Sequence, residues 1–410
     1  MAEPHLPRVA LRTDEIQRGP WVYARHVADG RGPGGRASAG AEALAGGSLV
    51  EVEDASGRFL GHALWNGSSD IRLRWLSRGK RSALREPGRF LEARLRAADR
   101  LRRRTLDLPR VSDAYRVAHA EGDDLPGLIV DRLGDVLVCE YHALGFARLH
   151  AEVEQALEAL YPEATVLHRI PRSARTNEGM EEDAVPIGPD RGAGTEVEVT
   201  EHGIAYPVLA GAGHKTGFFC DQRDNRRRVA ELAGGRDVLD LFCNLGGFGL
   251  HAARAGARRV RLVDLDEVTL ERAGAAADRN RLGLEIRHAD AFDVLRELGA
   301  GGRGPRPDLI VLDPKKLVVG RADLERGLRA YADLNALALA ALPPGGLLAT
   351  FSCSGAVDLG TFLGTVFGAA RRVDVGVRLL EVLGAAPDHP QRPDHPRSRY
   401  LKGAILTVDG

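Results

Sequence analysis

The sequence predicts an α/β protein in which a C-terminal parallel sheet, covered by helices on both faces, follows a small β-rich domain and an α+β middle domain. After Gly213, short apolar strands that end in an acid or a glycine alternate with helical segments of roughly ten to twenty residues. Before that point, the first 80 residues alternate apolar and polar side chains, which is the period of half-buried strands. A chain of 410 residues is long enough for two or three such domains.

The sequence before residue 213 predicts a β-rich domain, a linker helix and an α+β domain, in that order. Strand patterns at 48–53 and 71–76 place a β-rich domain in residues 1–84, with a Gly/Ala-rich loop at 30–47. Apolar residues then recur at three- and four-residue steps over 87–104, which predicts an amphipathic linker helix. This helix opens an α+β domain over 85–212, and residues 213–410 form the parallel-sheet domain.

Composition excludes several classes of protein. The four cysteines lie far apart without a C-x-x-C pair, so the sequence predicts neither a structural zinc nor a disulfide framework. No apolar run approaches the roughly 20 residues that cross a bilayer, and the N-terminus lacks the apolar stretch of a signal peptide. We therefore expect a cytoplasmic protein. The sequence leaves open whether it forms a homodimer.

Positive charge is concentrated in one segment although the net charge is zero. Residues 72–110 contain 14 Arg or Lys residues against four acids. Such a patch can neutralise the phosphates of a nucleic acid and draw it in. The alternative is a solvated helix in a chain that uses arginine almost to the exclusion of lysine.

Acids follow three successive strands of the predicted parallel sheet, where ligands of such sheets bind. Asp240 precedes a turn that contains Gly246 and Gly247, Asp264 ends the second strand, and Asp290 follows the third. Glycines let a backbone approach a ligand closely, and a carboxylate can accept both hydroxyls of a ribose. Three acids suit a cationic adenosine ligand better than a pyrophosphate. The alternative is that they are helix caps and turn residues.

The fourth and fifth strands lead into Asp313-Pro and Ser-Cys353-Ser. This pair suits chemistry at carbon 5 of a pyrimidine, because a thiolate must first add at carbon 6 to make carbon 5 reactive. Asp313 can hold the Watson–Crick edge of the base. The alternative for Cys353 is a buried packing residue, which is the role we predict for Cys139, Cys220 and Cys243.

These residues carry a resemblance that runs nearly from end to end. The chain resembles the RlmI-like family of class I, S-adenosylmethionine-dependent large-subunit ribosomal RNA cytosine-C5 methyltransferases, which combine an N-terminal PUA domain, an α+β domain and a Rossmann-like domain. The matching segments are Gly19-Pro-Trp-Val-Tyr, Glu121-Gly-Asp-Asp-Leu-Pro-Gly-Leu-Ile-Val-Asp, Lys215-Thr-Gly-Phe-Phe-Cys-Asp-Gln-Arg-Asp-Asn-Arg, Gly246-Gly-Phe, Asp313-Pro, Ser352-Cys-Ser, Asp388-His-Pro and Tyr400-Leu-Lys-Gly.

The resemblance implies a site and a partner. It implies S-adenosylmethionine as cofactor, ribosomal RNA as partner, Cys353 as nucleophile and Asp313 as the acid that binds the base. The cofactor-binding residues predicted from it and from the glycine turn are Gln222, Arg223, Asp240, Phe242, Asn244, Gly246, Gly247, Asp264 and Asp290. No residue is predicted to bind a metal.

Two departures from the family pattern keep alternatives open. Lys315 stands where the family has a second proline after Asp313-Pro, and the Asp240-Leu-Phe-Cys-Asn turn also resembles that of uracil-C5 methyltransferases. The predicted substrate base is cytosine, and uracil stays an alternative. Two further hypotheses are an enzyme that methylates an exocyclic amine, which needs no thiol, and a ribosome assembly factor that has lost activity.

Overall fold

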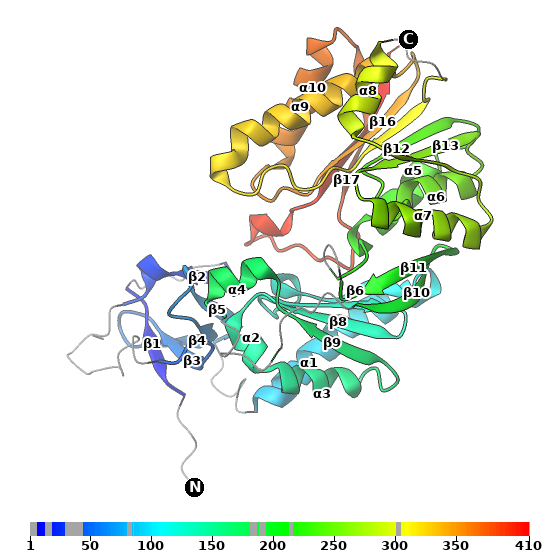
Figure 1. Ribbon diagram of the computed structural model, residues 1–410. Helices are drawn as coiled ribbons and strands as arrows, with labels where there is room; N and C mark the ends of the chain where they lie inside the picture. The colour runs from blue at the N-terminus through cyan, green and yellow to red at the C-terminus, as the bar shows by residue number, and fades with distance from the viewer. Residues whose placement is uncertain are drawn as a thin grey trace. The chain divides into compact units, whose positions relative to one another are not determined.

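The computed structural model describes residues 6–12, 19–28, 44–79, 84, 86–180, 187, 194–212, 216–300 and 305–409 (Figure 1). Most of the predicted loop at 30–47 and the residues at two predicted domain starts, 85 and 213, lie outside these ranges. The chain divides into two compact units. The first comprises Met1–Val197, Leu209–Phe218 and Asp388–Pro396, and the second comprises Glu198–Val208, Phe219–Pro387 and Arg397–Gly410.

A five-stranded sheet forms the N-terminal part of the first unit. Its strands are β1 (Arg8–Ala10), β2 (Trp21–Tyr23), β3 (Leu49–Glu53), β4 (Phe59–Trp65) and β5 (Ile71–Arg78), in the order β1-β3-β4-β5-β2. Only the β1–β3 pairing is parallel. Val50 and Val52 are buried while their neighbours in β3 are partly exposed, so the alternating sequence forms the strand that it predicted.

The rest of the first unit is the predicted α+β domain. The linker helix is α1 (Pro87–Arg100), which continues as a π-helical turn over Leu101–Thr105 and buries Leu91, Leu95 and Ala98. A second sheet has the order β6 (Ala114–His119), β7 (Leu128–Leu133), β8 (Val136–Tyr141) and β9 (Thr165–Arg169). The remaining helices are α2 (Leu144–Arg148), α3 (His150–Glu158) and α4 (Arg172–Glu178). Helix α1 packs on α3 and β6.

The second unit contains the predicted parallel sheet. Its strands are β12 (Asp237–Leu241), β13 (Arg259–Asp264), β14 (Glu285–His288), β15 (Leu309–Leu312), β16 (Leu347–Ser352), β17 (Val377–Gly384) and β18 (Lys402–Val408). Their order is β14-β13-β12-β15-β16-β18-β17, and β18 is antiparallel to both of its neighbours. A separate two-stranded sheet is formed by β10 (Thr195–Glu201) and β11 (Ile204–Ala210).

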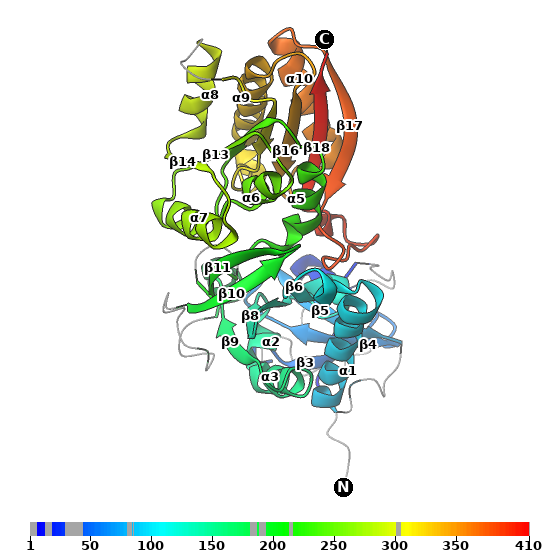
Figure 2. The same ribbon diagram turned by 90° about the vertical axis from the view of Figure 1, so that its right-hand side faces the viewer.

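Helices cover both faces of the seven-stranded sheet (Figure 2). One core contains residues of α5 (Arg223–Ala230), α6 (Gly247–Arg254) and α7 (Glu267–Asn280), and the other contains residues of α8 (Ala291–Gly299), α9 (Leu324–Ala341) and α10 (Leu359–Arg372). The strand order reverses between β12 and β15, which places a ligand crevice beyond the carboxyl ends of these strands. Within the described ranges, no helix combines the length and the apolarity that a bilayer crossing requires.

Candidate active site

The turn after β12 has an unusual backbone. Phe242 and Asn244 have φ angles of 60° and 50°, which side chains other than glycine rarely adopt, and Gly246 has φ of 74°. A Cβ at Gly246 would lie 2.8 Å from Leu262, so a glycine is needed there for space as well. Three left-handed residues within five positions make this a strained turn, and such strain is found at binding sites.

Asp264 is held by this turn. Its Oδ2 accepts a hydrogen bond from the main-chain N–H of Asn244 (2.8 Å), and its Oδ1 accepts from those of Leu265 (2.8 Å) and Asp266 (3.1 Å). These bonds fix the orientation of the carboxylate. Oδ1 already accepts two hydrogen bonds, whereas Oδ2 accepts one and retains a lone pair, so the half-buried Asp264 can still accept from a ribose hydroxyl.

Asp240 lies inside β12 and is fully buried. Its Oδ2 accepts from the N–H of Gly249 (2.9 Å), whereas no group in the described structure donates to its Oδ1. Burial is the main cause that raises the pKa of Asp240 to about 7, and the negative charges of Asp313 and Asp264 contribute to this rise. Acidic side chains whose negative charges act on one another fit a ligand that carries positive charge, such as the sulfonium of S-adenosylmethionine.

The raised pKa of Asp240 gives a prediction about stability. Between pH 3.8 and about 7, the folded protein holds this proton more tightly than the unfolded chain does. The contribution of Asp240 to the free energy of unfolding is therefore full at low pH and is lost as pH rises through about 7. We expect Asp240→Asn to raise the midpoint of thermal unfolding, relative to wild type, by about a few degrees more at pH 8 than at pH 5 in cofactor-free protein. A difference that does not change with pH would contradict this.

Asp313 directly follows β15, and a chain of side-chain amide hydrogen bonds holds its carboxylate. Its Oδ2 accepts a hydrogen bond from the side-chain amide of Gln222 (2.9 Å), which is itself buried. The amide oxygen of Gln222 accepts from Asn225 (2.6 Å), and Asn225 also donates to the main-chain oxygen of Gly384 (2.9 Å). Gln222, which the family resemblance assigned to the cofactor, thus orients the acid that we expect to bind the base.

Cys353 follows β16 and is half-buried, whereas Cys139, Cys220 and Cys243 are buried. Burial raises the pKa of the Cys139 and Cys243 thiols, which keeps them protonated and unreactive. The structure therefore agrees with the packing role of these cysteines and leaves Cys353 as the accessible thiol of the four.

Ser354 and Tyr331 together connect the two loops that carry Asp313 and Cys353. Its hydroxyl lies 2.9 Å from Oγ of Ser352, which donates to it, and 3.1 Å from Oγ of Ser354. Oγ of Ser354 also accepts from the N–H of Val318 (3.2 Å), in the loop that begins at Asp313. The two serines of the Ser-Cys-Ser motif are therefore structural partners of Tyr331, a residue that no sequence pattern indicated.

The remaining predicted residues have structural partners. Asp290 caps α8 and accepts from the N–H of Phe292 (2.7 Å), which is the helix-cap reading of this acid. Gly247 begins α6, and a Cβ there would collide with the guanidinium of Arg226. Arg223 is fully buried, and its Nε lies 3.3 Å from the carboxylate of Asp224.

Fewer side chains of the basic segment 72–110 can contact a nucleic acid than its composition suggested. Arg102 is fully buried and makes paired hydrogen bonds to Asp123 (2.6 and 2.7 Å), and Arg74 is buried against Glu178 (2.7 Å). Lys80, Arg81 and Arg85 lie outside the described residues. Two of the counted arginines therefore stabilise the first unit, and only the exposed remainder can meet phosphates.

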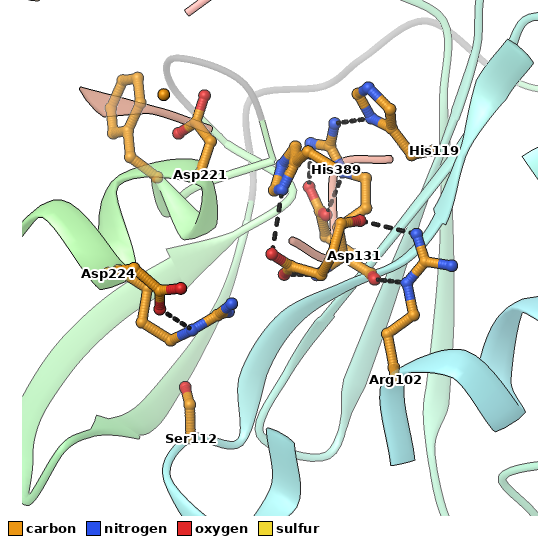
Figure 3. Close-up of polar contacts among 12 residues, drawn as sticks. Arg102, Ser112, His119, Asp131, Asp221, Asp224 and His389 are labelled. Atoms are coloured by element: carbon orange, nitrogen blue, oxygen red, sulfur yellow. Dashed lines mark hydrogen bonds and ion pairs between the residues drawn. The ribbon is translucent and has the colours of Figure 1, made fainter. Parts of the chain in front are cut away.

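The Asp388-His-Pro motif belongs to the interior of the first unit. Figure 3 shows Arg102, Asp131, His119 and His389 in one polar cluster. Within it, Asp388 accepts from the main-chain N–H of Arg116 (2.9 Å), and the guanidinium of Arg116 binds Asp131 (2.6 and 2.9 Å). Burial lowers the pKa of His119 well below its ordinary value, so this imidazole is neutral at pH 7. These contacts tie residues 388–396 to the first unit.

Comparisons with known proteins agree with this architecture. A profile described as a PUA-like domain matches residues 14–78, and one described as an S-adenosylmethionine-dependent methyltransferase matches residues 192–395. In fold, the chain is similar to SMU.776, described as a methyltransferase and solved with SAH (TM-score 0.78, 19% identity, 98% and 99% of the two chains covered). With the carboxylates at the strand ends described above, these findings define an S-adenosylmethionine-dependent methyltransferase with a PUA-like domain.

Curated relatives are similar over almost their whole length. The chain is 35% identical over 400 residues to the ribosomal RNA large subunit methyltransferase I of Aeromonas salmonicida (strain A449), covering 95% of this chain and 96% of that one. It is 36% identical over 400 residues to the protein of the same name from Tolumonas auensis, with the same coverage. The chain belongs to the ribosomal RNA large subunit methyltransferase I family.

The geometry of Asp264 gives a prediction about cofactor affinity. Replacing it with Asn removes the negative charge that favours a cationic adenosine ligand, so we expect binding of S-adenosylmethionine in calorimetry to weaken about tenfold to a hundredfold. Asp266→Asn is the matched control, because Asn also caps a helix well and Asp266 caps α7. Equal affinity of wild type and Asp264→Asn would remove Asp264 from the cofactor site.

Proposed function

We propose that this methyltransferase methylates carbon 5 of a cytosine in large-subunit ribosomal RNA through a transient bond between Cys353 and carbon 6 of the base. The observation that carries the proposal is the pairing of one accessible thiol with one oriented carboxylate: Cys353 and Asp313 follow adjacent strands, and Ser354 and Tyr331 connect their loops. The names of the curated relatives support the choice of RNA.

The roles of the protein's own groups follow from this pairing. The thiolate of Cys353 donates an electron pair to carbon 6, and the π electrons of the C5–C6 bond move to carbon 5. S-adenosylmethionine supplies the methyl group that carbon 5 takes up. Loss of the proton from carbon 5 then restores the double bond and releases the thiolate, so the enzyme is regenerated. Asp313 holds the base throughout, because Gln222 fixes its carboxylate.

The carboxylate of Asp313 also favours cytosine over uracil. An ionised carboxylate only accepts hydrogen bonds. Cytosine presents an amino group at carbon 4, which donates, whereas uracil presents a carbonyl oxygen there, which the carboxylate repels. The amide N–H that Gln222 donates to Oδ2 fixes the orientation of the Asp313 carboxylate and thereby supports this preference.

The cofactor site in this proposal uses the turn after β12 and the acids around it. Asp264 accepts from a ribose hydroxyl, the glycines of the turn at 242–247 let the backbone approach the ligand, and Asp240 precedes that turn with a carboxylate oxygen to which no group in the described structure donates. We assign the adenine amino group to Asp290, and Gln222 and Arg223 support the site from the start of α5. The domain boundaries proposed with it are 1–84 for the PUA-like RNA-binding domain, 85–212 for the linker helix and α+β domain, and 213–410 for the methyltransferase domain. We place the enzyme in the cytoplasm.

The test is a map of modified nucleosides in ribosomal RNA from cells with and without the gene. We expect one 5-methylcytidine of the large-subunit RNA to be lost without the gene and restored by the wild-type chain. Loss of 5-methyluridine would support the uracil enzyme, loss of an N-methylated base would support the exocyclic-amine enzyme, and an unchanged map would support the inactive assembly factor.

A further inference from the structure

Lys402 is a buried lysine beside the proposed nucleophile. It is the first residue of β18 and pairs with Ser352, the last residue of β16, so it lies across the sheet from the start of the Ser-Cys-Ser turn. Only 4% of Lys402 is exposed, in a chain with five lysines. A lysine is rarely buried to this extent without a specific partner for its charge.

The ammonium of Lys402 holds the backbone that follows Cys353. Its Nζ donates to the main-chain oxygens of Ser354 (2.6 Å) and Val357 (2.5 Å), the two ends of the turn after the thiol. Carbonyl oxygens are neutral, so these bonds orient the lysine without neutralising it. The hydroxyls of Tyr331 and Ser352 hold the same turn, because they hydrogen-bond to the hydroxyl and the main-chain N–H of Ser354.

The charges around Lys402 come from three elements and include the thiol. Burial is the main cause that lowers the pKa of Lys402 to about 8; Lys316 acts in the same direction, whereas Cys353 and Asp358 oppose it. Asp358 caps α10 and accepts from the N–H of Thr361, and the charge of Lys402 contributes to the lowered pKa of Asp358. Electrostatic coupling is reciprocal, so a lysine that a thiolate stabilises must stabilise the thiolate to the same extent.

We infer that Lys402 is a positioning residue for Cys353: its ammonium fixes the turn that follows the thiol and provides the positive charge against which the thiolate forms. The inference rests on the proposed role of Cys353. It gives the lysine of the Tyr400-Leu-Lys-Gly segment a role, because a neighbouring positive charge favours the thiolate form of a cysteine.

The test measures the thiol directly, in the full-length protein without RNA. The rate of alkylation of Cys353 by iodoacetamide is followed by peptide mass spectrometry from about pH 6 to about pH 10, since the other three cysteines are buried. For wild type we expect a midpoint below the value of about 8.5 of free cysteine. For Lys402→Met we expect the midpoint to rise by about one unit, which is about tenfold less thiolate at pH 7. Lys402→Arg, which keeps the charge, should restore most of the shift.

Lys316→Met is the matched control, because it removes an exposed lysine that faces the same cluster. Solvent screens an exposed charge, so we expect a much smaller rise of the midpoint. A wild-type midpoint at or above that of free cysteine overturns the inference even if Lys402→Met does not fold. A change of the alkylation rate by one factor at every pH, with no shift of the midpoint, overturns the electrostatic role. Methylation by a Cys353→Ala variant would instead defeat the proposed function, whatever Lys402 does to the thiol.

Discussion

Replacing Cys353 with Ala is expected to lower kcat for RNA methylation by about 10⁴-fold or more, because carbon 5 of a pyrimidine is too weak a nucleophile to take a methyl group unaided. Binding of S-adenosylmethionine should be unchanged, since Asp240 and Asp264 lie on β12 and β13 and the cofactor turn follows β12, whereas Cys353 follows β16. Methylation is measured as transfer of labelled methyl groups to a large-subunit RNA fragment, and cofactor binding by calorimetry.

A trapping experiment sharpens this prediction. RNA that contains 5-fluorocytidine cannot lose a proton from carbon 5, so the bond between the thiol and carbon 6 should persist and shift the protein on a denaturing gel. We expect the adduct with wild type and with Cys243→Ala, a matched removal of a thiol from the turn after β12. Cys353→Ala should give none. Undiminished methylation by Cys353→Ala would exclude covalent catalysis and favour methylation of an exocyclic amine.

Asp313→Asn is expected to have the second largest effect, a fall in kcat for RNA methylation of about 10²- to 10⁴-fold. The substitution keeps the volume of the side chain but replaces an acceptor by a group that also donates. The amide of Gln222 then loses the charge to which it donates, and the base loses its carboxylate partner. Methylation is measured under saturating S-adenosylmethionine, so that an effect on cofactor affinity does not lower the rate.

Asp308→Asn is the control for that variant, because Asp308 precedes the same strand at its opposite end. Asp308 accepts from the N–H of Asp237 (2.9 Å) and pairs with Arg258, and it lies away from the carboxyl ends of the strands. We expect it to affect stability and not kcat. If both variants lose activity equally, the loss reports damage to β15 and not the removal of the base-binding acid.

The sequence predicted the fold well wherever a repeating pattern determined it. A repeating pattern predicted β3 from its alternation and α1 from its three- and four-residue steps, since each element buries one face. The apolar strands before Asp264 and Asp313 also form where expected. The class of enzyme and its cofactor followed from the same strand ends and from the family resemblance.

Contacts between residues distant in the chain were less predictable. Charge counting treated Arg102 as a surface residue, yet Asp123 neutralises it in the interior. Nothing local to Gln222 indicates that it meets Asp313, 91 positions later. Tyr331 lies on α9 with no motif around it, and its role depends on β15 and β16 lying side by side. These partners are determined by tertiary packing, which a single sequence does not display.

Tyr331 and Ser354 couple the positions of the two loops that carry Asp313 and Cys353, so the sequences of these loops are expected to change together. A chimera that takes its Asp-Pro loop from one relative and its Ser-Cys-Ser turn from another has a matched pair only if the phenol that bridges them is kept. Transferring this chemistry to another doubly wound protein therefore requires α9 as well as the two loops. Without α9, the loops would lack the hydroxyl that holds the Ser-Cys-Ser turn.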